Sequence, residues 1–139
     1  MADDLASANV NRTYSLGATS IAIFTFTLIF LYPRYLTGEA NAALFQVTLI
    51  VMAIATFSLV FASFHYYASS LPGRMSETER LGYARRGDVL WMLGATSLFL
   101  APSLVLFTIG LVGVGLAWLA LWIVYVLFVA LTFPRVRQK

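Results

Sequence analysis

His65 is the only histidine of the chain, and it closes a long apolar run in the stretch FASFHYYASSLPG (61–73). An imidazole changes its charge near neutral pH, so at this position it could line a pore or sense protons. On a helix, Ser58 and His65 share one face. The acidic partner that we predict for His65 is Asp88. A simpler interpretation, which we favour, makes His65 and Asp88 polar anchors at the membrane–water boundary.

Hydroxyl groups are the other side chains of the apolar segments that could do chemistry. Ser20 and Thr27 fall on one helical face, with Phe24 between them. Such oxygens could line a narrow neutral path and partly replace the hydration shell of an ion, with Ile23 and Phe24 as an apolar constriction that gates by dewetting. The alternative is helix packing, in which hydroxyls bond a carbonyl of their own helix or reach a neighbouring helix.

Several chemistries are excluded by residue type. The chain has no cysteine and one histidine, so thiolate sites and metal cages of several histidines are not available. All its carboxylates lie outside the apolar segments or at their ends, which argues against a proton-coupled antiporter with an acid at mid-depth. No nucleotide-binding loop or catalytic triad is present. We therefore expect no enzyme activity, no catalytic residues, no metal, no cofactor and no nucleic-acid partner.

The composition is that of a membrane protein. Hydrophobic residues make up 60% of the chain and charged residues only 11%, with a mean hydropathy of +0.84, whereas soluble domains carry about 25% charged residues. A span needs about 20 apolar residues and must satisfy its own backbone hydrogen bonds, so it is helical. We predict one all-α domain over 1–139, an integral membrane four-helix bundle. Its helices are expected at about 13–32, 43–67, 88–110 and 116–133.

The basic residues predict the orientation of these spans. Of the nine Lys and Arg residues, Arg34 alone falls on one side of a four-span protein, and the other eight fall on the side of both termini. Basic residues concentrate on the cytoplasmic side, so both termini should be cytoplasmic. On the same side, Ser76 and Glu79 have the spacing of a capping box, which predicts a short interfacial helix from Glu77 that Gly82 and Gly87 could bend. The first and fourth spans are expected to end before a proline, and the glycine-rich IGLVGVG should make the last two an antiparallel hairpin.

The last segment carries Trp118, Trp122 and Tyr125 at helical spacing. Such an aromatic stripe could stack a quinone or a pigment. More often it faces lipid or packs against another subunit. Small residues on the faces of the second and third segments would let helices approach closely, so we expect a homo-oligomer or association with other membrane subunits in the lipid bilayer.

In order, the landmarks of the first three segments resemble the DUF1211 membrane family, the bacterial relatives of the lysosomal potassium channel. Arg12 precedes SIAIFTFTLIFLYP, the second segment ends in FHYYASS, and the third reads DVLWMLGATSLFLAP. The resemblance covers about residues 12–102. It implies potassium conduction and a bacterial or archaeal plasma membrane. The family's Phe-Ser-Asp triplet is replaced here by Tyr14-Ser15-Leu16, and the family usually has six spans.

Two functions follow as hypotheses. In the first, the protein oligomerises as a channel for a small cation, with potassium as the expected ion, and its path is lined by Ser20 and Thr27 or by Ser58 and His65. In the second, it is a non-catalytic accessory or scaffold subunit of a larger membrane protein complex.

Overall fold

The structure is a computed structural model that describes residues 2–71 and 75–136, with side chains over 8–71 and 75–131. Its four helices are α1 (Ala2–Leu36), α2 (Ala42–Ser70), α3 (Glu77–Thr108) and α4 (Val112–Val136). Each contains a stretch long and apolar enough to cross a membrane, and the described residues include no strand. The prediction of an all-α membrane protein with four spans is confirmed.

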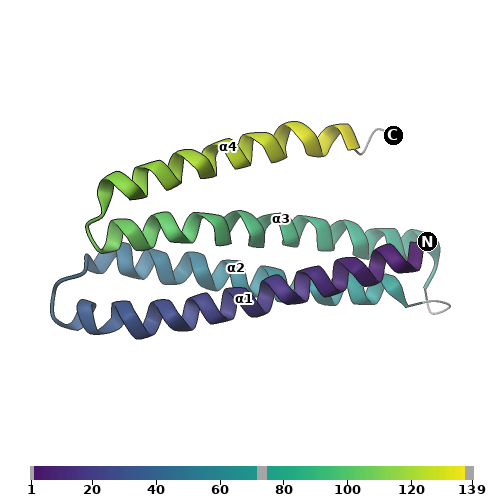
Figure 1. The fold of residues 1–139 in the computed structure, drawn as a ribbon. Helices are drawn as coiled ribbons and strands as arrows, with labels where there is room; N and C mark the ends of the chain where they lie inside the picture. The colour runs from purple at the N-terminus through teal and green to yellow at the C-terminus, as the bar shows by residue number, and fades with distance from the viewer. Residues whose placement is uncertain (1, 72–74, 137–139) are drawn as a thin grey trace.

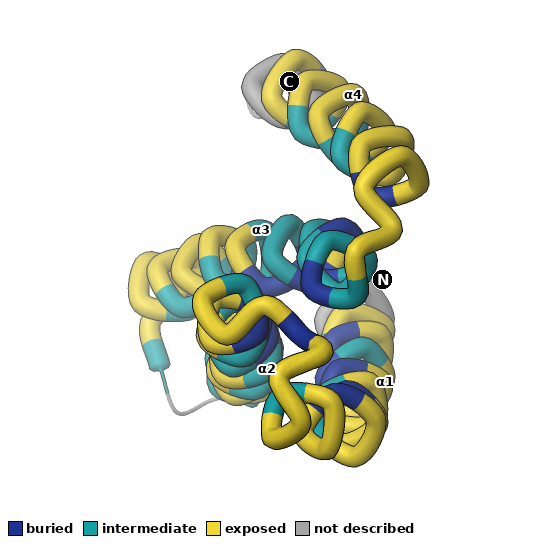
Figure 2. Tube along the Cα trace, turned by 90° about the vertical axis from the view of Figure 1, so that its left-hand side faces the viewer, coloured by how far each residue is buried: buried dark blue, intermediate teal, exposed yellow. Residues whose placement is uncertain are grey.

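The helices run up and down (Figure 1). The first turn of α1, the last turn of α2, the first turn of α3 and the last turn of α4 lie at one end of the bundle, here called the terminal end. Helix α2 packs against both α1 and α3, whereas α4 packs on α3 alone among the described helices. In the view along the helices, α4 stands apart and is exposed over most of its surface (Figure 2).

The core lies between α2 and α3 and depends on small residues. Ala55 and Leu59 of α2 are fully buried and pack against Leu98 of α3. Gly94 permits this approach: a Cβ atom there would lie 2.7 Å from Cγ of Leu59 and 3.1 Å from the carbonyl oxygen of Ala55. The predicted small-residue faces therefore do bring two helices together, within one chain.

Helix α1 runs past Pro33 to Leu36, although the sequence predicts an end at residue 32. A proline removes one helical hydrogen bond and clashes with the preceding turn. Pro33 lies in the last turn of α1, so its effect is confined to the end of the helix. The basic side chain of Arg34 in that turn also suits the negative end of the helix dipole. The chain then turns at Gly38, whose φ of 76° favours glycine, and α2 begins with a cap in which Asn41 accepts a hydrogen bond from the amide of Leu44.

Helix α3 begins where the sequence predicts, with a complete capping box between Ser76 and Glu79. The predicted short interfacial helix is not separate, because α3 continues without a break through Gly82 and Gly87 into the membrane span. Glycine lowers helix stability by only about 1 kcal/mol, so a 32-residue helix that packs on α2 can include both positions.

The α3–α4 connection is the tight hairpin that its glycines predict. Gly110 adopts a φ of 80°, and α4 begins at Val112, four residues earlier than expected. Gly115 lies within α4 and faces α3. A Cβ atom there would lie 2.8 Å from the ring of Phe107, so glycine permits the close approach of the two helices. At its other end α4 continues to Val136, beyond its predicted end at residue 133.

Candidate functional site

Polar and aromatic side chains of three helices meet near the terminal end. The hydroxyl group of Tyr66 (α2) donates a hydrogen bond of 2.7 Å to Oδ1 of Asp88 (α3). The guanidinium carbon of Arg12 (α1) lies 5.4 Å from the ring centroid of Trp91 (α3), a cation–π distance. These four residues, here called the terminal-end cluster, line a cavity of about 160 Å³ together with Asn9 and Thr13.

Gly87 explains why the cluster forms at this height. A Cβ atom on Gly87 would lie 3.0 Å from Cδ1 and Cε1 of Tyr66, so any larger residue would push the tyrosine ring away from α3. With glycine there, the ring is nearly buried against α3, and its hydroxyl group reaches the carboxylate of the next residue. The sequence analysis treated Gly87 as a position where the helix could bend. In the structure, its missing side chain instead lets the Tyr66 ring of α2 lie close to α3.

The structure does not bring His65 to Asp88. The ring of His65 lies 5.7 Å from that of Tyr83, and it lines a cavity of about 550 Å³ with Arg85 and Arg86. Successive residues of an α-helix are about 100° apart, so when Tyr66 faces Asp88, its neighbour His65 faces another part of α3. The expected pairing of His65 with Asp88 is therefore replaced by a Tyr66–Asp88 pair, and the ring contact of His65 is with Tyr83.

The hydroxyls of α1 lie in its contact with α2. Ser20 is fully buried, and its hydroxyl group lies 2.8 Å from that of Thr56, which also donates to the carbonyl of Met52. Thr27 is buried on the same face. Ile23 is 39% exposed, so it points away from that face, and Phe24 is only partly buried between them.

Two further hydroxyl-bearing residues of α2, Thr48 and Ser58, are buried. Thr48 lies 3.4 Å from Thr108, each also donating to a carbonyl of its own helix. In the described part of the chain, no buried side-chain nitrogen or oxygen lacks a hydrogen-bond partner. No fully buried polar atom of the described residues is therefore left unsatisfied for a ligand or an ion.

The aromatic stripe of α4 faces α3. The indole N–H groups of Trp118 and Trp122 donate hydrogen bonds of 2.9 Å to the carbonyls of Phe99 and Thr96. A third bond joins the hydroxyl of Ser103 to the carbonyl of Gly115. The tryptophans are thus engaged within the chain, which the sequence analysis did not anticipate.

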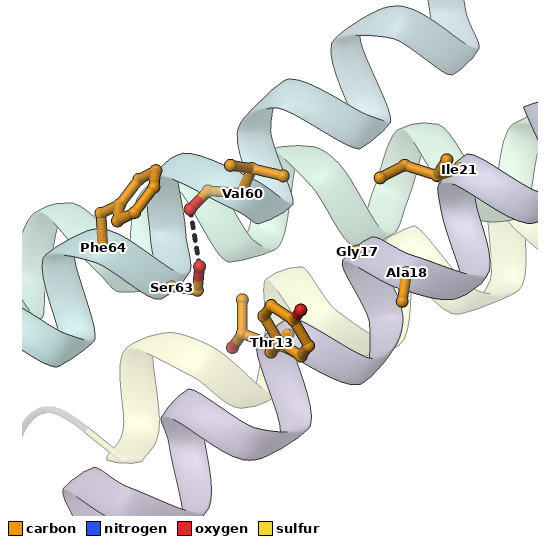
Figure 3. A pocket seen from close by; sticks show the side chains of 8 residues that line it. Thr13, Gly17, Ala18, Ile21, Val60, Ser63 and Phe64 are labelled. Atoms are coloured by element: carbon orange, nitrogen blue, oxygen red, sulfur yellow. Dashed lines mark hydrogen bonds between the residues drawn. The ribbon is translucent and has the colours of Figure 1, made fainter.

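Two further cavities flank α1. A shallow groove of about 160 Å³ runs between α1 and α2, beside Gly17, Ala18 and Val60 (Figure 3). Its serine, Ser63, donates to the carbonyl of Val60, so the groove offers mainly apolar contact. A larger cavity of about 380 Å³ lies between α1, α3 and α4, with Arg12 and Trp91 in its lining.

No group of three or more His, Asp or Glu side chains able to hold a metal ion occurs among the described residues. The comparisons with known proteins place no constraint on the site: no family model matches the chain, and neither the curated proteins nor the solved structures give a match. The function therefore has to be argued from the geometry. The chain is a multi-pass membrane protein whose most concentrated polar chemistry is the terminal-end cluster.

Proposed function

We propose that this membrane protein is a non-catalytic accessory or scaffold subunit of a larger membrane complex. The observation that carries the proposal is the use of its polar groups: the hydroxyls of Ser20 and Thr56 bond to each other, and those of Thr48 and Thr108 do the same. In the described residues no fully buried side-chain nitrogen or oxygen lacks a partner. A bundle with such an interior has packing faces and no polar pathway of its own. The charge distribution supports a placement with both termini in the cytoplasm.

Helix α4 is the face that we assign to the partner. It is fastened to α3 along one edge, and its outer side carries exposed apolar residues such as Leu121, Val124 and Phe128. Because α4 has no second neighbour among the described helices, an additional transmembrane helix can pack on it without displacing any contact of the chain. The partner would be a helix of another membrane protein or of a second copy of this chain.

The alternative is an oligomeric cation channel, in line with the resemblance to relatives of a potassium channel. Its path would have to form between chains, or the contact between α1 and α2 would have to open to release Ser20 and Thr27. Opening that contact breaks the bond between Ser20 and Thr56. For this reason the subunit proposal is the better supported of the two.

The test is purification from native membranes in a mild detergent, with the wild-type chain compared with two variants. We expect foreign membrane chains in fixed stoichiometry with the wild type. Val124→Trp on α4 should reduce their recovery, whereas Ile29→Trp, at an equally exposed apolar position of α1, should not.

Potassium flux into proteoliposomes containing only this chain separates the two functions. The subunit proposal predicts no flux above empty liposomes and no effect of Ser20→Ala. A single closed homo-oligomer with potassium-selective flux, altered by Ser20→Ala, would refute it in favour of the channel.

A further inference from the structure

The terminal-end cluster opens toward the larger cavity between α1, α3 and α4. Arg12 and Trp91 line both the 160 Å³ cavity of the cluster and the 380 Å³ cavity beside it. The remaining lining of the larger cavity is mostly apolar: Ser15, Leu16, Ala95, Leu98, Phe99 and Tyr125. A charged mouth therefore adjoins an apolar recess, which is the distribution of polarity in a lipid molecule.

The mouth carries one positive and one negative group. Arg12 contacts the face of Trp91, and Asp88 accepts a hydrogen bond from Tyr66 on Oδ1. Although Arg12 and Asp88 line the same cavity, no ion pair joins them among the described residues. A ligand with a single net charge would be attracted by one group and repelled by the other, whereas a zwitterion in the right orientation is attracted by both.

We infer that this site binds a zwitterionic phospholipid with a primary ammonium group, that is, a phosphoethanolamine headgroup. The phosphate lies at the guanidinium group of Arg12, which suits phosphate oxygens. The ammonium group donates hydrogen bonds to the carboxylate of Asp88, whose charge it neutralises. A quaternary ammonium headgroup has no N–H donor for Asp88, and an anionic glycerol headgroup has no cation for it.

The depth of the apolar recess fits one acyl chain. Trp91 and Phe99 are eight residues apart on α3, which corresponds to about 12 Å along the helix axis. One leaflet of the hydrocarbon core is about 15 Å thick, so the recess covers most of it. Arg12 directly precedes the apolar part of α1, which puts the mouth at headgroup level.

The inference can be tested by native mass spectrometry of the delipidated full chain in detergent. Lipids with ethanolamine, glycerol and choline headgroups and identical acyl chains are offered separately. We expect the wild type to bind the ethanolamine lipid about fivefold more tightly than the glycerol lipid, the effect of one charge near a membrane surface. A preference of about the same size over the choline lipid is expected from the hydrogen bond to Asp88. Equal or tighter binding of the glycerol lipid would overturn the inference, and so would equal binding of all three.

Two variants assign the headgroup contacts. Asp88→Asn keeps an oxygen that accepts from Tyr66, and it should abolish the preference for ethanolamine over choline. Arg12→Gln, at an exposed position, should weaken the binding of all three lipids, whereas Arg34→Gln at the opposite end of α1 is the matched control and should behave as wild type. A preference for ethanolamine that persists in Asp88→Asn would place the ammonium elsewhere and overturn the assignment. The wild-type ranking decides the question even if a variant does not fold.

Discussion

Replacement of Gly94 by alanine probes the closest approach in the bundle. The new methyl group would lie 2.7 Å from Cγ of Leu59, about 0.7 Å short of the 3.4 Å at which ordinary contact begins. Leu59 is fully buried in the core, where it packs with Ala55 and Leu98. The carbonyl oxygen of Ala55 at 3.1 Å closes the other side. The helices α2 and α3 must therefore separate, and overpacking of this kind costs about 1–3 kcal/mol.

Gly82 of the same helix provides the control, because a Cβ atom there meets nothing within 4 Å. Gly82→Ala should raise the free energy of unfolding by up to about 1 kcal/mol through helix propensity. Both substitutions share that gain, so the difference in their free energies of unfolding isolates the packing cost. We expect Gly94→Ala to be less stable than Gly82→Ala by about 1–3 kcal/mol. The assay is unfolding by SDS in mixed micelles, followed by the fluorescence of the tryptophans on α3 and α4.

A second background makes the assignment to Leu59 specific. Leu59→Ala removes Cγ, so Gly94→Ala should cost much less in that background than in the wild type, a coupling that a double-mutant cycle measures. If Gly94→Ala stabilises the protein as much as Gly82→Ala does, the close packing of α2 on α3 at this point is refuted.

Three further predictions follow from single hydrogen bonds. Ser20→Ala, which removes the bond to Thr56, should lower the free energy of unfolding in micelles by about 0.6 kcal/mol, and no change would mean that the α1–α2 contact is looser than described. Trp122→Phe removes one hydrogen bond between α4 and α3 and should lower the stability of their contact by about 1 kcal/mol. We expect faster amide exchange in α4 but not in α1, and an equal increase in both helices would contradict the prediction. Ser76→Ala breaks the capping box with Glu79 and should cost about 1 kcal/mol, visible as faster exchange in the first turn of α3, whereas unchanged exchange there would count against the cap.

The number of helices could be predicted from the sequence because the hydropathy of a span does not depend on its neighbours. The same holds for the capping box at Ser76, which involves residues three positions apart. The tight turn at Gly110 is also local. These features are set by the chain over short distances, so no knowledge of the packing is needed.

The site could be predicted only in part, because it depends on the rotation of each helix about its axis. The sequence identified Asp88 as a polar group at the membrane boundary but paired it with His65, one position away from its actual partner, Tyr66. The signal that could have corrected this is Gly87, since a glycine beside the aspartate allows an aromatic ring to approach. Arg12 was used only for the orientation and for the family resemblance, although its position before the apolar part of α1 also places it at the headgroup level.

The attachment of α4 has a consequence for biosynthesis. Helix α4 is synthesised after α1, α2 and α3, and among the described helices it contacts only α3. The contacts among α1, α2 and α3 can therefore form completely before α4 leaves the ribosome, in keeping with the vectorial folding of chains. When α4 arrives, its indole groups find backbone carbonyls of α3 as acceptors, and every residue carries such a carbonyl. The docking of α4 thus relies on backbone acceptors of α3 for both of its tryptophans, with the Ser103 hydroxyl group as the one α3 side chain among these three hydrogen bonds.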